Sequence, residues 1–510
     1  MDIIKQRRGI QECYRSTKPI PSQLLDHCTV CLEEQLYCQA FELFSCALIS
    51  GTGSALPAQI PPPQYLALAA TLTVHPSFTN RTRSEDKHDA ANKALRYIQD
   101  VLTLCGSRAS GIYKAFQYKP KPTSSRCYKK QVSGRRQAQV NSDSEDESGR
   151  LHSTYASTES LWQNAEDFWS VIGWAFNCSV AHRARWVRWK LWLEVMLDTL
   201  EVDLKACVSE DCVHESIFAQ YLNSIGESRN NKRRLMRAIL ADGKQKSLAE
   251  FGEIWRNETQ PPKPKKGDDR FGSNRKLDVE NGEFGDYFDD SDNESREESA
   301  RNSTSQRKVI VAGDQNSIEG FGGVDSMNFR RRILALLIQY CTIEPHTFLD
   351  TDDLLDLYTE FLRPLPLPIF RQFVLPSKPW LDSKEQFSLD QMLLRPLLSH
   401  AVPVYDENAI TQQDFELHFA PFCSNLSNVV DNAKLSLLVE DLLRLLWRMG
   451  RLSYSEALKV SVEEGIEARR CKVLVGGRRK AGFRAAEDEE ARAILEHSGK
   501  RMLAILDMIQ

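Results

Sequence analysis

The sequence predicts an all-α protein, made of helical bundles or irregular α-solenoid blocks that are joined by disordered, charged linkers. Two observations lead to this prediction. Apolar residues recur at intervals of three and four over most of the chain, which is the spacing of a buried helix face. Between these stretches lie segments that are rich in charge and poor in large apolar residues, and such segments bury too little surface to fold.

These changes of composition divide the 510 residues into helical domains and linkers. We expect an N-terminal helical domain at 1–118, a linker at 119–156 and a tryptophan-rich central domain at 157–258. A second linker is expected at 259–324, followed by a C-terminal helical domain at 325–510. The hydrophobic content of 41% is sufficient for real cores in the helical parts.

The N-terminal domain should consist of paired helices. The prolines at 61–63 end one pair and begin the next. Ala40, Phe44 and Ala47 have the spacing of the second helix in a tetratricopeptide repeat, and no second copy follows about 34 residues later. This resemblance implies antiparallel helix pairs and no more. The expected helices are Ile3–Arg15, Ser22–Glu34, Tyr37–Ile49, Gln64–Thr73, Glu85–Cys105 and Ile112–Phe116.

The central domain contains six of the nine tryptophans, at Trp162, Trp169, Trp174, Trp186, Trp189 and Trp192. A solvent-exposed group of such large rings would make an apolar surface patch that promotes aggregation, so we expect the tryptophans to form a hydrophobic core. One helix is predicted from Ser160, which could form a capping box with Gln163. A second helix is predicted from about Arg183.

Cations between and after these tryptophans allow a sharper interpretation. Arginine beside an aromatic ring suits base stacking and phosphate contact, so these residues could bind nucleic acid or an acidic partner. Because Trp186, Trp189 and Leu193 share one helix face, we expect the arginines to fall mostly on the other face. The candidate contacts are Arg183, Arg185, Arg188, Lys190, Lys232, Arg233, Arg234 and Arg237.

The linkers carry short motifs of three kinds. Serines among acidic residues are typical substrates of acidophilic kinases, and here they are Ser142, Ser144 and Ser291. A basic cluster resembles a nuclear localisation signal through Lys263, Lys265 and Lys266. Aromatic residues among aspartates resemble a docking motif that folds onto a partner, and they are Phe284, Tyr287 and Phe288.

The C-terminal domain is predicted to be helical to its end. The alternating prolines in 363–368 indicate a helix stop and a rigid turn. The leucines of 437–446 make a helix so apolar that it must be buried or paired. The expected helices are Phe329–Cys341, Thr351–Leu362, Leu389–His400, Gln413–His418, Leu426–Met449, Tyr454–Arg470 and Ala485–Met508.

No catalytic signature is present in the sequence, which lacks G-x-S-x-G, H-E-x-x-H and the protein-kinase set. The histidine and cysteine groups at 27–38 and 207–214 are assigned to packing in preference to zinc. We therefore expect no enzyme activity and no catalytic, cofactor or metal site. We expect no leader, and together with the odd number of cysteines, 13, this expectation favours reduced thiols. No apolar run approaches the roughly 20 residues of a membrane helix.

The expected function is a non-enzymatic helical scaffold or adaptor subunit of a nuclear complex, of which chromatin and genome-maintenance complexes are examples. Its partners would be other protein subunits, bound through helical surfaces and linker motifs, and no membrane or small-molecule substrate is expected. The expected location is the nucleus, with the cytoplasm as the alternative. The alternative function is direct DNA or RNA binding through the basic helix faces and the basic tail at 108–136.

Overall fold

The computed structural model of the chain describes residues 14–54, 56–118, 151–261, 316–406, 410–477 and 485–510. Their regular secondary structure is almost entirely helical, which confirms the all-α prediction. The strands within the described part are β1 (Thr17–Pro19) and β2 (Ala58–Ile60), which pair in parallel next to the helix at 37–49. None of the described helices is both long enough and apolar enough to cross a lipid bilayer.

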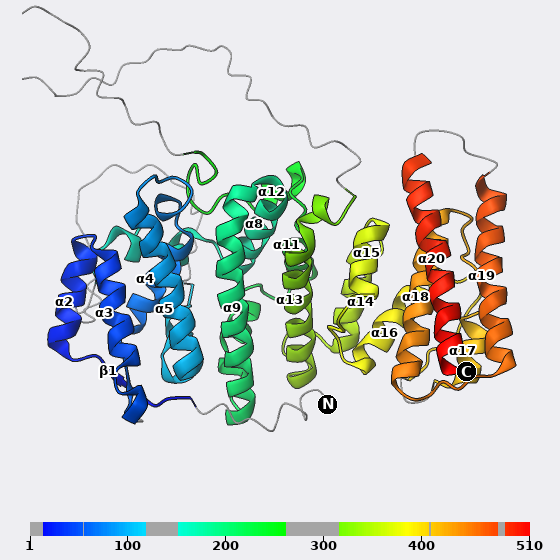
Figure 1. The fold of residues 1–510 in the computed structure, drawn as a ribbon, viewed down its shortest axis with the longest axis horizontal. Helices are drawn as coiled ribbons and strands as arrows, with labels where there is room; N and C mark the ends of the chain where they lie inside the picture. Colours follow the sequence, from blue (N-terminus) through cyan, green and yellow to red (C-terminus); the bar gives the residue numbers. More distant parts are fainter. Residues whose placement is uncertain (1–13, 55, 119–150, 262–315, 407–409, 478–484) are drawn as a thin grey trace, which may run out of the picture.

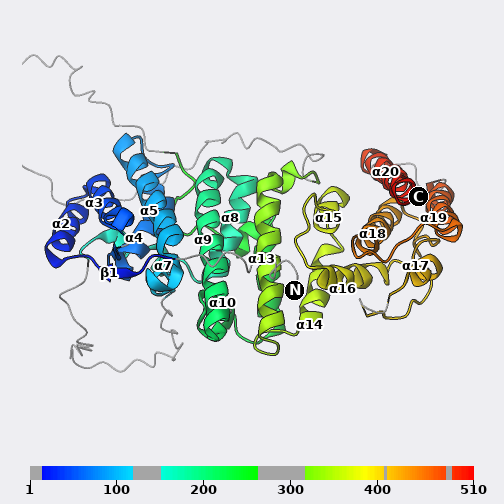
Figure 2. The ribbon, with the colours of Figure 1, turned by 60° about the horizontal axis from the view of Figure 1, so that its bottom comes forward.

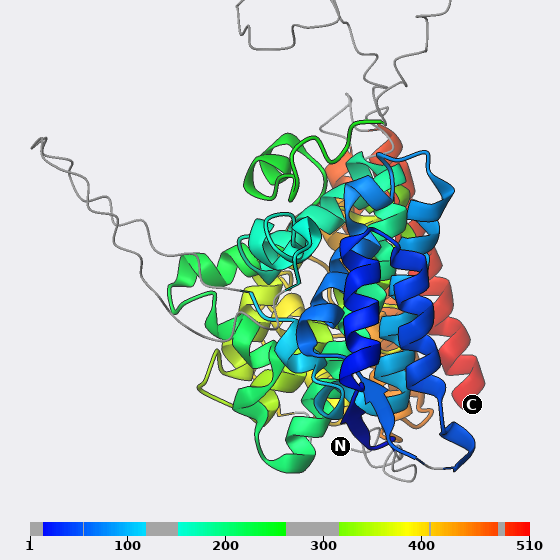
Figure 3. The same ribbon diagram turned by 90° about the vertical axis from the view of Figure 1, so that its left-hand side faces the viewer.

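The N-terminal helices follow the predicted bounds closely, because apolar spacing and prolines are local signals. The first two form a hairpin, which faces the viewer in Figure 3. The predicted helix at 3–15 lies almost wholly outside the described residues. The observed helices are α2 (Ser22–Glu33), α3 (Tyr37–Ile49), α4 (Pro63–Val74), α5 (Glu85–Ala109) and α6 (Ile112–Ala115).

The central helices differ from the prediction at their start. Ser160 makes no side-chain capping hydrogen bond, and the helix after it ends within one turn. Asp167 caps the next helix instead, since its Oδ1 accepts from the backbone amide of Ser170 at 2.7 Å. The prediction of one helix from Ser160 was therefore wrong. The observed helices are α7 (Leu161–Asn164), α8 (Phe168–Ala181), α9 (Arg183–Glu210), α10 (Ile217–Asn223), α11 (Arg229–Ile239) and α12 (Gln245–Glu250).

The C-terminal helices include one that the sequence analysis missed. The prolines of 363–368 do stop a helix, but they also start a short one, with Pro366 at its N-cap and Pro368 in its first turn. The leucines of 437–446 are buried, as predicted. The observed helices are α13 (Gly323–Ile343), α14 (Thr351–Leu362), α15 (Leu367–Val374), α16 (Ser383–Leu394), α17 (Gln412–His418), α18 (Val429–Arg448), α19 (Glu456–Gly477) and α20 (Ala485–Ile509).

The helices stand side by side in one elongated row, from α2 at one end to α19 and α20 at the other (Figure 1). The same order is visible from a second direction (Figure 2). Helix α9 packs against α5 on one side and against α13 on the other. Helices from the N-terminal, central and C-terminal parts of the chain are therefore in direct contact.

The six tryptophans of residues 162–192 lie in the interior, and none is more than 8% exposed. This burial confirms that they form a hydrophobic core. Trp189 stacks on Trp255 from the end of the central part, with ring centroids 6.2 Å apart. The core thus joins residues that are far apart in the sequence.

Candidate functional site

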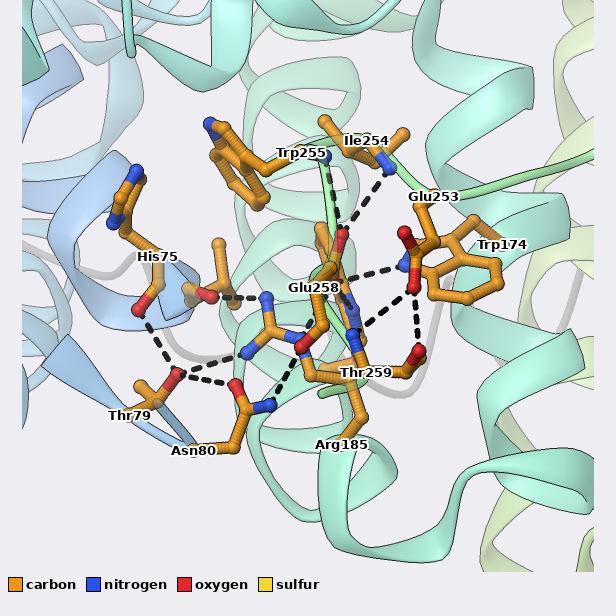
Figure 4. A network of polar contacts seen from close by, with 12 residues as sticks. His75, Thr79, Asn80, Trp174, Arg185, Glu253, Ile254, Trp255, Glu258 and Thr259 are labelled. Atoms are coloured by element: carbon orange, nitrogen blue, oxygen red, sulfur yellow. Dashed lines mark hydrogen bonds and ion pairs between the residues drawn. The ribbon is translucent and has the colours of Figure 1, made fainter. Parts of the chain in front are cut away.

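A buried carboxylate lies at the centre of the tryptophan-rich core (Figure 4). Oε1 of Glu258 accepts from Nε of Arg185 at 2.5 Å and from the indole N–H groups of Trp174 and Trp189 at 2.9 Å each. Oε2 accepts from the two backbone amides at 254–255, at 3.1 and 3.3 Å. The charge is therefore surrounded by donors, as a buried carboxylate requires.

The same network reaches the N-terminal helices. Arg185 donates through Nη1 to the hydroxyl of Thr79 at 2.9 Å, and through Nη2 to the carbonyl of Val74 at the end of α4. Asn80 donates to the backbone carbonyl of Glu258 at 2.6 Å. Because these groups satisfy one another within the protein, the network is structural and joins α4 to the central helices.

Of the eight predicted contact residues, Arg185 is the one that is buried in the structure. The expectation that the arginines of this helix mostly face away from the core was wrong for Arg185, because Glu258 supplies a counter-charge inside the core. Local spacing contains no signal for this pairing, since the two residues are 73 positions apart.

The other seven predicted contact residues each have an acceptor within the protein. Arg183 and Lys190 bridge α9 to the segment 319–325, and Lys232 and Arg233 bridge α11 to the segment 348–360. The structure therefore uses these cations to hold neighbouring helices together. The pairs on α9 are Arg183 with Glu319, Arg188 with Asn92 and Lys190 with Asp325. The pairs on α11 are Lys232 with Phe348, Arg233 with Glu360, Arg234 with Asp167 and Arg237 with Glu250.

The linker motifs lie outside the described residues. These are Lys263, Lys265 and Lys266, the aromatic residues Phe284, Tyr287 and Phe288, and the serines Ser142, Ser144 and Ser291.

Two of the cysteines considered as zinc ligands are packing residues in α2. Cys28 and Cys31 are buried on the inner face of this helix. Burial, and next the neighbouring Cys31, raise the pKa of Cys28 to about 11, so its thiol stays protonated at neutral pH. Within the described ranges, no group of three or more histidine, cysteine or acidic side chains is placed to hold a metal ion.

Sequence reasoning missed an arginine-lined pocket of about 570 Å³ among the C-terminal helices. It is bounded by α15, α16, α18, α20 and the loop at 375–381. We call it the arginine pocket. Its charged lining residues are Arg371, Arg444, Arg448 and Arg501, which face only two carboxylates, Glu440 and Asp441.

The buried carboxylate of Glu440 organises two of these arginines. Arg501 forms a two-pronged contact with it, from Nε at 2.7 Å and from Nη2 at 2.6 Å. Arg444 donates to the same carboxylate from Nη2 at 2.7 Å. Planar guanidinium groups held in this way have fixed orientations, with other N–H groups left over for a ligand.

Arg371 completes the cluster from α15. Its guanidinium group has no hydrogen bond or ion pair with any residue that the structure describes. Partial burial, and next the charge of Arg501, lower the pKa of Arg371, with partial compensation by Glu440. A cation crowded by other cations and lacking a partner favours the approach of an anion.

The second carboxylate, Asp441, contributes little excess negative charge. It accepts from Nε2 of Gln386 at 2.7 Å, and Arg448 lies 3.9 Å from its Oδ1. Asp390 lies behind it, and burial, followed by the neighbouring charge of Asp441, raises the pKa of Asp390 well above its ordinary value. The raised pKa favours the protonated form of Asp390.

A second pocket, of about 600 Å³, continues from the first across the loop at 375–381. The two pockets share Ser377 and Pro379. We call them together the basic groove. Its further cations are Arg331, Arg332 and Lys378, and its further acid is Glu201.

One local sequence pattern is associated with the arginine pocket. Glu440, Asp441, Arg444 and Arg448 form a charged stripe on a helix whose leucines require burial. Charges on a buried helix need partners, so this stripe could have been identified as part of a site. Arg371 and Arg501 come from other helices, and no local pattern connects them.

Comparison of this chain with known protein families, with characterised proteins and with solved structures finds no match. Function has to be inferred from the chemistry of the site.

Proposed function

We propose that this protein is a non-enzymatic helical scaffold or adaptor that binds an acidic segment of a partner protein in the basic groove. One observation carries the proposal: cations outnumber carboxylates in the groove by seven to three. Concave surfaces with an excess of one sign of charge concentrate the field and attract partners of the opposite charge. The cations are Arg331, Arg332, Arg371, Lys378, Arg444, Arg448 and Arg501.

Two further features support a protein partner. Trp380 and Trp447 line the groove next to the cations, and Trp447 is 40% exposed. Tryptophan and arginine together are the residues most enriched where protein interfaces gain their affinity. The elongated row of helices also offers long flanks on which more than one partner could dock (Figure 1).

The test is affinity purification of the tagged full-length chain from its own cells, with partners identified by mass spectrometry. Arg371 and Lys378 are suitable targets because they are exposed and have no partner among the described residues. The double variant Arg371→Glu, Lys378→Glu should lose a stoichiometric partner. The matched control is Arg395→Glu with Lys246→Glu, two exposed cations outside the groove. Equal recovery of partners by both double variants would overturn the proposal.

The proposal includes a nuclear location, which Lys263, Lys265 and Lys266 would direct. Replacement of these three lysines by alanine should move a fluorescently tagged protein towards the cytoplasm. An unchanged distribution would reject the signal. A second partner contact is proposed at Phe284, Tyr287 and Phe288, whose replacement by alanine should lose at least one co-purifying protein.

A further inference from the structure

We infer that the arginine pocket binds a phosphate monoester, carried by a phosphorylated side chain in the partner's acidic segment. This inference rests on the proposed function and names the group that the basic groove recognises.

The charge balance of the pocket leaves two positive charges without a counterpart. Arg448 lies beside Asp441, and the remaining three arginines share the single carboxylate of Glu440. A phosphate monoester carries about −1.5 to −2 at pH 7 and would neutralise this excess. An aspartate or glutamate side chain brings only one negative charge.

The geometry suits an anion with several oxygens. Arg371, Arg444 and Arg501 come from three different helices and line one pocket. Glu440 orients two of them in advance, and their side chains remain 40% and 30% exposed, so that their outer N–H groups are accessible. Guanidinium forks match the spacing of phosphate oxygens and bind them through paired hydrogen bonds.

The pocket also favours a monoester over nucleic acid. A nucleic-acid strand presents one charge per phosphate at regular intervals, and a protein that binds it needs cations along a track. Here three arginines gather at one point in a cavity of about 570 Å³. The adjoining second pocket, with Trp380 and Lys378, is where residues next to the phosphorylated one would lie.

The direct test is fluorescence anisotropy of a labelled acidic heptapeptide with one central phosphoserine, titrated with the purified full-length protein. Two further peptides carry serine or glutamate at the central position. The phosphoserine peptide should bind at least tenfold more tightly than either. Arg371→Gln should remove this preference, and Arg395→Gln should change the affinity less than twofold. Circular dichroism checks that both variants are folded.

The outcomes separate this inference from the proposed function. Equal binding of the three peptides would overturn the phosphate inference, and partner capture through the basic groove is then decided by the purification experiment alone. A single-stranded oligonucleotide of about 20 residues that binds more tightly than the phosphopeptide, with Arg371 dependence and a steep salt dependence, would also overturn it in favour of nucleic acid. Release of the captured partner by phosphatase is the expected result in the purified complex.

Discussion

The guanidinium of Arg185 donates to the carboxylate of Glu258 over 2.5 Å, and neither side chain is more than 1% exposed. The two residues belong to α9 and to the end of the central part, and their shared network reaches α4. A buried ion pair adds little net stability compared with an apolar pair of equal volume, but the loss of one partner leaves a buried charge uncompensated. The pair therefore favours a single arrangement of α9, α4 and the end of the central part.

The first prediction concerns this pair. Glu258→Gln keeps the volume of the side chain but removes the counter-charge of Arg185. We expect the free energy of unfolding to fall by about 3–5 kcal/mol, as measured by urea denaturation followed by tryptophan fluorescence. Glu319→Gln is the control, because its ion pair with Arg183 is exposed and should contribute less than about 1 kcal/mol. Similar losses in the two variants would contradict the structural role of the network.

The second prediction concerns the close approach of α13 to α8. Gly322 has a φ of +99°, and a Cβ there would lie 2.1 Å from the Oγ of Ser179. Gly450 has a φ of +68° with nothing within 4 Å of the same position. Gly450→Ala should therefore lower the free energy of unfolding only by the backbone strain, about 1–2 kcal/mol. Gly322→Ala should cost a further 1–3 kcal/mol or so from overpacking, and equal losses in urea denaturation would refute this contact.

The third prediction is a pH dependence that arises from Asp390, which faces Asp441 and lies within the field of Arg448. Because burial raises the pKa of Asp390 in the folded protein above that of the unfolded chain, its contribution to stability is full below the unfolded pKa. This contribution is lost as the pH rises towards the folded pKa. The free energy of unfolding of Asp390→Asn should therefore rise relative to that of the wild type, by up to about 1.4 kcal/mol per pH unit from pH 5 upwards.

Urea denaturation at a series of pH values from 5 to 8 checks this prediction. Asp356→Asn, on the exposed face of α14, is the control and should run parallel to the wild type. Parallel profiles for Asp390→Asn and the wild type would show that Asp390 is ionised in the folded protein.

The fourth prediction concerns the counter-charge of the arginine pocket. Glu440→Gln removes the carboxylate shared by Arg444 and Arg501, and should lower the free energy of unfolding by about 1–3 kcal/mol. Inorganic phosphate should raise the melting temperature of this variant more than that of the wild type, because a ligand that binds only the folded state stabilises it. Sodium chloride at equal ionic strength is the reference, and an equal effect of both salts would argue against an anion site.

Much of the helical structure could be predicted because the signals are local. The bounds of α3 and α14 agree with the prediction at both ends, since apolar spacing and adjacent helix breakers define them. Helix α15 was missed because its eight residues are too few to show a period, and its prolines were read only as a stop. The start of α8 was misplaced because Ser160 and Asp167 both offer caps, and only packing decides between them.

The amino-acid sequence by itself determined that the chain is helical, that its tryptophans are interior and that its leucine-rich C-terminal helix is buried. Each of these follows from periodicity and from the cost of exposing apolar surface to water. Only the tertiary structure decided which charges meet. Arg185 met Glu258 inside the core, and Arg371, Arg444 and Arg501 met at one pocket, because a charge pairs with whatever the fold brings within a few ångströms and not with its neighbours along the chain.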